Sequence, residues 1–168
     1  MTRTLYRLAP LTGAAFFVLI VVALIIEGNP PDADEPTQEV VSWWTENDSK
    51  SLAAALLGGL ASALLVWFGG SVWATLRRAE GEPGRIAAIA FGGFLIAGVG
   101  NASLFGFVSA TAQTSGDVPA EVTQTLSVLS ELFFIPFAMG LLVALLATAV
   151  VILHHGGLYR AGSASSRS

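Results

Sequence analysis

The chain has 168 residues, of which 54% are hydrophobic and only 12% are charged, and its mean hydropathy is +0.69. Soluble domains carry about 25% charged residues, so this composition excludes a soluble globular class. The chain has no cysteine, which excludes disulfides, thiolate metal sites and cysteine nucleophiles, and it has no run of like charges suited to nucleic acid.

Four uncharged stretches are long enough to cross a bilayer, because its hydrocarbon core of about 30 Å requires about 20 apolar residues in a helix. The predicted spans are residues 8–26, 51–76, 86–109 and 132–153. The third stretch stays uncharged as far as Gly116, but its polarity rises from Ser109, so we expect the helix to end near residues 108–110. We expect the first span to be retained; a cleaved signal peptide is the alternative, because the stretch has a basic start.

Basic residues are divided unequally between the two sides of a chain that crosses four times. All but Lys50 fall on one side, before the first span, between the second and third, or after the fourth; they are Arg3, Arg7, Arg77, Arg78, Arg85, Arg160 and Arg167. Because short basic loops remain in the cytoplasm, this division predicts that both termini are cytoplasmic. Of the 12 acidic residues, all but Glu80 and Glu82 fall on the opposite side.

The first outer loop contains a predicted helix over residues 37–47, with Pro36 at its start. Its adjacent Trp43 and Trp44 are typical of an aromatic belt, so we expect them to anchor the helix at the membrane interface. The alternative is an aromatic platform for a sugar or a partner protein. Residues 1–160 form a single predicted transmembrane domain, and residues 161–168, rich in Ser, are expected to be disordered.

Small residues recur every four positions in the second and third spans. The positions expected to support helix packing are Gly58, Ser62, Gly98, Ala102 and Gly106. Small residues at this spacing allow two helix backbones to approach closely, and such packing drives helix association in lipid. We therefore expect these spans to pack against each other or against copies in an oligomer.

Asn101 is the one carboxamide well inside a span. One interpretation is an interhelical hydrogen bond, which is the common use of such a residue in a membrane. The other is a ligand contact: Asn101, Gln113 and Glu131, next to the helix break expected at Pro136, would line an outward-facing polar pocket. Glu131 has a simpler interpretation as a charge that the helix dipole favours at an N-terminus.

The sequence contains no motif for chemistry. The cores of the four spans lack Asp, Glu, Lys and Arg, the residues that ion-coupled transporters and pumps place there. Serine-hydrolase, zinc-protease, P-loop and dinucleotide motifs are also missing. We therefore expect no catalytic residue, no metal and no cofactor.

Four short stretches carry a resemblance to known proteins. They are Trp43-Trp-Thr-Glu-Asn47, Leu64-Leu-Val-Trp-Phe-Gly-Gly70, Leu76-Arg-Arg-Ala-Glu-Gly81 and Ile86-Ala-Ala-Ile-Ala-Phe-Gly-Gly93. Together they resemble a group of multi-span membrane proteins common in actinobacteria and described by a domain of unknown function. The resemblance covers about residues 40–159. It implies a location in a bacterial plasma membrane and supplies no catalytic residues.

The sequence therefore predicts an all-α integral membrane four-helix bundle with cytoplasmic N- and C-termini. The leading functional hypothesis is a non-enzymatic protein that acts through helix packing, as a homo-oligomer or as a subunit with another membrane protein, with the lipid bilayer as its other partner and no nucleic acid. The alternative is a small-molecule or lipid binder or transporter with the outward-facing pocket around Asn101. A membrane enzyme is the third possibility, and it would need paired ionisable groups near one interface.

Overall fold

The structure, a computed structural model, describes residues 2–32 and 35–155, so the predicted tail of residues 161–168 lies outside it. All regular secondary structure in the described part of the chain is α-helical, which confirms the all-α class. The helices are α1 (Thr2–Glu27), α2 (Thr37–Glu46), α3 (Asp48–Glu80), α4 (Arg85–Thr114), α5 (Ala120–Leu132) and α6 (Phe134–His155).

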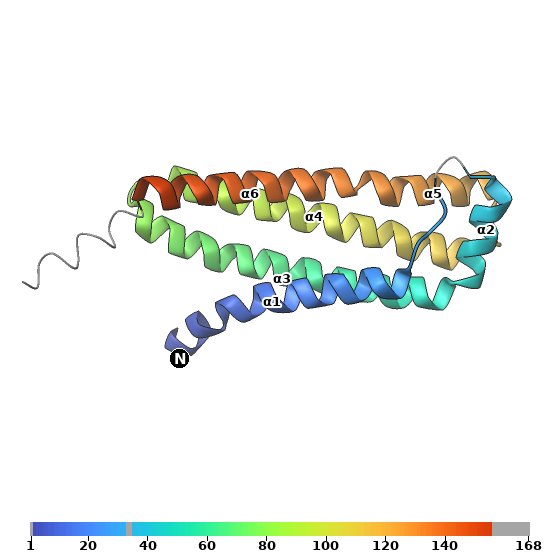
Figure 1. The fold of residues 1–168 in the computed structure, drawn as a ribbon, viewed down its shortest axis with the longest axis horizontal. Coiled ribbons are helices and arrows are strands. Elements are labelled where there is room, and N and C mark those ends of the chain that lie inside the picture. The colour runs from blue at the N-terminus through green and yellow to red at the C-terminus, as the bar shows by residue number, and fades with distance from the viewer. Residues whose placement is uncertain (1, 33–34, 156–168) are drawn as a thin grey trace, which may run out of the picture.

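The four longest helices lie side by side along the long axis of the molecule, and α2 crosses one end of them (Figure 1). Within the described residues α1 packs along α3, α3 along α4, and α4 along α6, whereas α1 has no comparable packing against α4 or α6. The order of packing is therefore a row, α1–α3–α4–α6, with α4 between two long neighbours. The start of α1 and the end of α6 lie at the same end of the row (Figure 1).

Among the residues that the structure describes, three helical segments are long and apolar enough to cross a membrane: Asp48–Glu80, Arg85–Thr114 and Ala120–His154. The last of these joins α5 and α6, and the apolar part of α1, Leu11–Glu27, is shorter. The outward faces of these helices carry large apolar side chains such as Leu56, Val99 and Leu145. Such surfaces are suited to lipid, so the chain is a helical membrane protein.

The third predicted helix is longer than the sequence suggested, because α4 continues to Thr114 instead of ending near residues 108–110. Its polar side chains bond to their own helix. The hydroxyl of Thr111 donates to the carbonyl of Phe107 at 2.8 Å, and that of Thr114 donates to the carbonyl of Ala110 at 2.9 Å. Polar groups that are satisfied in this way do not end a helix, so the rise in polarity after Ser109 marks no helix end.

A carboxylate links α3 to α4 across the short turn between them. Glu80, the last residue of α3, accepts hydrogen bonds from the backbone N–H groups of Ile86 at 2.9 Å and Ala87 at 2.8 Å. These N–H groups lie in the first turn of α4, where they have no partner within the helix. The negative charge is also favoured by the helix dipole there. The turn is closed by Gly81 and Gly84, whose φ angles of 80° and 69° favour glycine.

The α4 and α6 backbones approach each other closely at glycines. A Cβ atom added at Gly93 would lie 2.5 Å from the backbone nitrogen of Ala144, and one added at Gly100 would lie 2.5 Å from the backbone nitrogen of Phe137. On α6, a Cβ at Gly140 would collide with the backbone of Ala97. No side chain other than hydrogen fits at these positions, so the three glycines set the distance between the two helices.

Candidate functional site

Asn101 bonds α4 to α3 inside the protein. Its side chain is 1% exposed, and its Nδ2 donates to the carbonyl oxygen of Gly58 at 3.0 Å and to Oγ of Ser62 at 2.8 Å. Ser62 in turn donates to the same carbonyl at 2.9 Å. A Cβ at Gly58 would overlap the ring of Phe105, which fills the remaining space. Three of the residues predicted from spacing or polarity, Gly58, Ser62 and Asn101, therefore form one contact between α3 and α4.

The structure does not bring Asn101 together with Gln113 and Glu131. Gln113 is exposed, and its Nε2 donates to the carbonyl and the hydroxyl of Ser109 on its own helix, at 3.1 and 2.8 Å. Glu131 is exposed on α5. Asn101 is directed into the interface with α3, so these three residues do not line a common pocket in this structure.

The remaining small residues separate into an inward set and an outward set. Gly98 faces inward, because a Cβ added there would lie 2.6 Å from the side chain of Val66. Ala102 and Gly106 face outward, as does Gly59 on α3, and a Cβ at either glycine would meet nothing within 4 Å. Within the described chain, the small size of these outward residues therefore does not serve the close approach of two helices.

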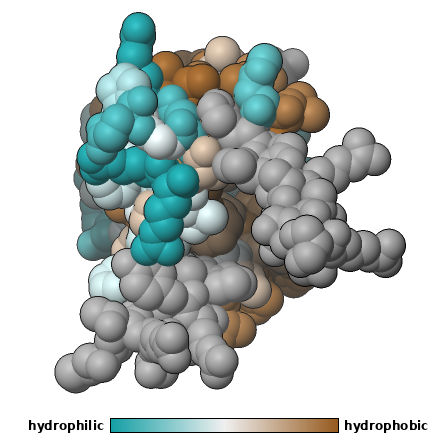
Figure 2. Space-filling view, turned by 90° about the vertical axis from the view of Figure 1, so that its left-hand side faces the viewer, coloured by the Kyte–Doolittle hydropathy of each residue, from teal (hydrophilic) through white to brown (hydrophobic). Residues whose placement is uncertain are grey.

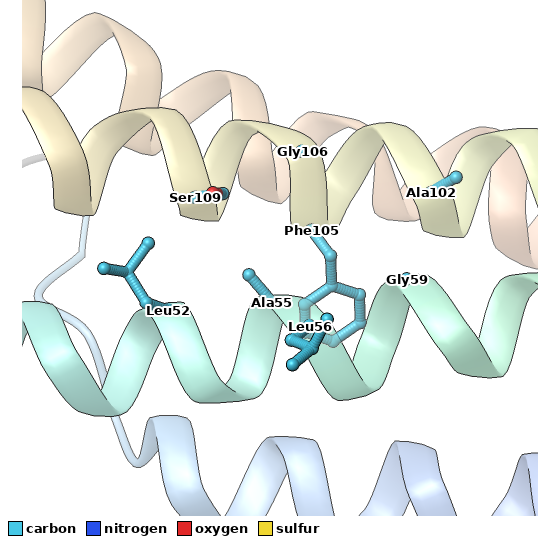
Figure 3. Close-up of a pocket in the computed structure, with 8 residues that line it drawn as sticks. All are labelled: Leu52, Ala55, Leu56, Gly59, Ala102, Phe105, Gly106 and Ser109. Carbon is cyan, nitrogen blue, oxygen red and sulfur yellow. The ribbon is translucent and has the colours of Figure 1, made fainter.

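These outward residues line a groove between α3 and α4 with a volume of about 290 Å³ (Figure 3). Its lining residues are Leu52, Ala55, Leu56, Gly59, Ala102, Phe105, Gly106 and Ser109. Phe105 extends from α4 toward α3 (Figure 3), and its ring lies against Gly58. The groove is apolar, and the one polar side chain in its lining, Ser109, already accepts a hydrogen bond from Gln113.

Trp44, which the sequence predicts as an interfacial anchor, is packed inside the protein. It is fully buried, and its Nε1 donates to Oγ of Ser127 on α5 at 3.2 Å. Trp43 is half-buried and meets the Trp44 ring edge to face, with 5.0 Å between ring centroids. Trp44 therefore attaches α2 to α5 across the end of the helix row.

Further hydrogen bonds hold α2 in this position. Oγ1 of Thr37 donates to Oε1 of Gln124 at 2.7 Å, and the hydroxyl of Ser115 donates to the carbonyl of Val41 at 3.2 Å. Thr45 and Ser115 also share a hydrogen bond of 3.1 Å between their hydroxyl oxygens. Helix α2 is thus fixed to α5 and to the end of α4, and it covers this end of the row (Figure 1).

The buried face of α5 carries hydroxyl groups, which reasoning from sequence missed. Thr123, Ser127 and Ser130 are buried, whereas the apolar Leu126 and Leu129 are half-buried. The three hydroxyl residues are four and three positions apart, and this spacing indicates one helical face. Polar residues are not normally expected on the inward side of a helix. The hydroxyls of Thr123 and of Ser51 on α3 are buried with no hydrogen-bond partner among the described residues.

Glu27, one of the acidic residues that the sequence assigns to the outer side, is buried. It ends α1 with a side chain that is 8% exposed, and no described residue forms a hydrogen bond or ion pair with it. Buried carboxyl groups of this kind reduce stability unless they are paired. Among the described residues, no group of three or more His, Cys, Asp or Glu side chains is placed so that it could hold a metal ion.

The groove that includes Gly59, Ala102 and Gly106 has no ionisable side chain in its lining. No known protein family, no curated protein and no solved structure matches this chain.

Proposed function

We propose that this chain is a non-enzymatic membrane protein that crosses the bilayer four times and acts by packing its helices against a second copy or against another membrane protein. The observation that carries the proposal is the outward-facing groove of Gly59, Ala102 and Gly106. In lipid, close backbone approach at small residues is a main source of helix association. Within the chain, α4 and α6 approach each other closely at small residues, and the groove presents small residues to a helix of another molecule in the same way.

A fourth crossing is supported by the length of α1. At 1.5 Å per residue the apolar part, Leu11–Glu27, is about 26 Å long. The earlier residues of α1, which begins at Thr2, extend it beyond the hydrocarbon core of about 30 Å. An even number of crossings also agrees with the position of both described ends at one end of the row (Figure 1).

The charges support cytoplasmic termini. The turn between α3 and α4 carries the exposed residues Arg77, Arg78 and Arg85 and lies at the same end as the start of α1. The opposite end carries exposed acidic residues, including Glu39 on α2 and Glu121 on α5. The positive-inside rule then directs the basic end to the cytoplasm. The resemblance to multi-span proteins of actinobacteria adds a bacterial plasma membrane to this proposal.

Engineered cysteines test the association directly, because the natural chain has none. Gly106→Cys places a thiol in the groove, and Leu145→Cys places one on the exposed face of α6, where the side chain is 62% exposed. Oxidative crosslinking in native membranes is expected to give disulfide-linked dimers, or products with another protein under a bifunctional maleimide, for Gly106→Cys and not for Leu145→Cys. Monomers alone in both variants would overturn the proposal.

The same approach tests the orientation. A membrane-impermeant maleimide added to intact cells is expected to label Glu121→Cys and to label Glu82→Cys only after permeabilisation. Both native side chains are exposed, so access of the reagent depends on the side of the membrane. The reverse pattern contradicts the orientation, and labelling of both positions in intact cells contradicts the number of crossings.

A further inference from the structure

The outward face of α3 carries a second hollow, separate from the groove between α3 and α4, at the basic end of the molecule. One part has a volume of about 500 Å³ and is lined by Trp73, Ala74, Arg77, Arg78, Gly81 and Glu82. A neighbouring part of about 370 Å³ is lined by Trp67, Gly70, Ser71 and Ala74. The two parts share Ala74 in their linings, so they lie next to each other along α3. We call the two parts together the α3 hollow.

The end of the α3 hollow nearest the turn is cationic. The guanidinium of Arg77 lies 5.6 Å from the ring centroid of Trp73, whose ring is 5.9 Å from that of Phe91. This cation–π contact keeps the guanidinium of Arg77 beside Trp73, and tryptophan is a residue suited to the membrane interface. Arg78 adds a second guanidinium to the lining. Figure 2 looks onto this end of the molecule, where the described hydrophilic residues gather on one side beside hydrophobic ones.

The other end of the α3 hollow is apolar and open. Trp67 is 67% exposed, and Gly70, Ser71 and Ala74 follow it at the spacing of one helical face. The nearest atom to a Cβ added at Gly70 would be 3.9 Å away, so the missing side chain leaves free space. The hydroxyl of Ser71 donates to the carbonyl of Trp67 at 3.3 Å, which leaves the surface without a polar group that needs water.

We propose that the α3 hollow binds one anionic phospholipid, with its phosphate at Arg77 and Arg78 and an acyl chain over Trp67, Gly70 and Ala74. From Trp67 to Arg78 the helix rises about 16 Å, which matches one leaflet of a hydrocarbon core of about 30 Å. The guanidinium fork matches phosphate oxygens in geometry and charge. The binding site goes beyond the proposed association and does not depend on it, since the hollow and the groove have no lining residue in common.

The lining of the α3 hollow also includes a carboxylate, Glu82. Glu82 pairs with Arg77 at 3.2 Å, and its side chain is 82% exposed. An exposed ion pair of this kind is weak, so a lipid phosphate displaces the carboxylate at little cost. Glu82 therefore competes with the lipid. Its removal is expected to strengthen anionic lipid binding, which a purely structural role of this pair does not predict.

Native mass spectrometry of the full chain, titrated with dioleoyl phosphatidylglycerol or dioleoyl phosphatidylcholine in detergent, tests the site. The wild type is expected to bind phosphatidylglycerol more tightly than phosphatidylcholine. The double variant Arg77→Gln/Arg78→Gln is expected to lose about thirty-fold in affinity for phosphatidylglycerol, at about fivefold for each arginine near a lipid surface. Arg85→Gln is the matched control, because Arg85 is exposed at the same end but does not line the hollow.

Two more variants distinguish a bound phospholipid from a bound free phosphate. Glu82→Gln is expected to increase affinity for phosphatidylglycerol several-fold, and this gain shows binding even if the arginine double variant folds poorly. Gly70→Leu fills the apolar part and is expected to weaken the lipid, whereas inorganic phosphate at millimolar concentration is expected not to displace it. Equal effects of Arg85→Gln and the double variant, no preference for phosphatidylglycerol, or displacement by inorganic phosphate with an unaffected Gly70→Leu each overturn the assignment.

Discussion

Gly92 and Gly93 are neighbours in α4, yet alanine is expected to change stability in opposite directions at the two positions. A Cβ at Gly93 would lie 2.5 Å from the backbone nitrogen of Ala144 and 2.7 Å from the carbonyl oxygen of Gly140, whereas one at Gly92 would meet nothing within 4 Å. Backbone atoms cannot rotate away. Gly93→Ala therefore has to move α4 and α6 apart by about 1 Å to restore van der Waals distances of about 3.5 Å.

The size of the effect follows from this separation. Overpacking by one methyl group typically costs about 1–3 kcal/mol, and a gap of about 1 Å removes up to about half of each dispersion contact along the interface. Gly100 and Gly140 lie on the same interface, so their close contacts loosen too. We expect Gly93→Ala to lower the free energy of unfolding by about 2–3 kcal/mol. Gly92→Ala is expected to raise it by about 0.5–1 kcal/mol, because alanine restricts the unfolded chain more than glycine does.

Reversible unfolding in mixed micelles, by titration with sodium dodecyl sulfate and detection by tryptophan fluorescence, measures both variants against the wild type. Far-UV circular dichroism before the titration verifies that each variant has the native helix content. If Gly93→Ala proves as stable as Gly92→Ala, the α4 and α6 backbones do not approach each other as closely as the structure has them.

The same unfolding assay checks four further predictions. Asn101→Leu is expected to lower the free energy of unfolding by about 1–2 kcal/mol, because two interhelical hydrogen bonds are lost. The half-buried control Ser109→Ala is expected to leave it nearly unchanged, and equal effects of the two variants would contradict the role of Asn101. Glu80→Gln is expected to lower the free energy of unfolding by about 1–2 kcal/mol, because Glu80 caps α4, and Glu82→Gln by less than about 0.5 kcal/mol, because Glu82 forms only a surface ion pair. A larger effect of Glu82→Gln would contradict the cap. Ser127→Ala leaves the buried indole N–H of Trp44 without its partner and is expected to cost about 1–3 kcal/mol; no change would mean that this bond is replaced. Glu27→Leu is expected to raise stability by about 1–3 kcal/mol, and a loss instead would show that the carboxyl has a stabilising partner.

Much of the helical architecture could be predicted from sequence, because length and apolar composition determine which segments can cross a lipid core. The helix over residues 37–47 was predicted from its proline start and appears as α2, Thr37–Glu46. The interhelical hydrogen bond of Asn101 was one of two interpretations that the sequence left open, and it is the one present in the structure. A carboxamide in a span has few other ways to satisfy its donors.

The orientation of each small residue could not be predicted, because in lipid both faces of a helix are apolar. In a soluble helix, polar residues on one side identify the outside. In α4, Gly98 faces a neighbouring helix and Gly106 faces outward, although both lie in the same four-residue repeat. The hydroxyl face of α5 was missed for a related reason. The partner of Ser127 is Trp44, 83 positions away along the chain, and no local pattern indicates such a pair.

The row of helices bears on how the chain enters a membrane. Helix α1 is made before α3, the long helix it packs along, because α3 follows only after α2 has been synthesised. In the proposed topology α1 must therefore stay in lipid without α3 for a time, with the face that later packs against α3 exposed. Its sequence suits such a state, with Phe17, Val18 and Ile25 still exposed after α3 has docked. Helices α3 and α4 differ from α1 in this respect, because only a short turn separates them. They can enter the membrane as a pair in which Glu80 of α3 already caps the first turn of α4.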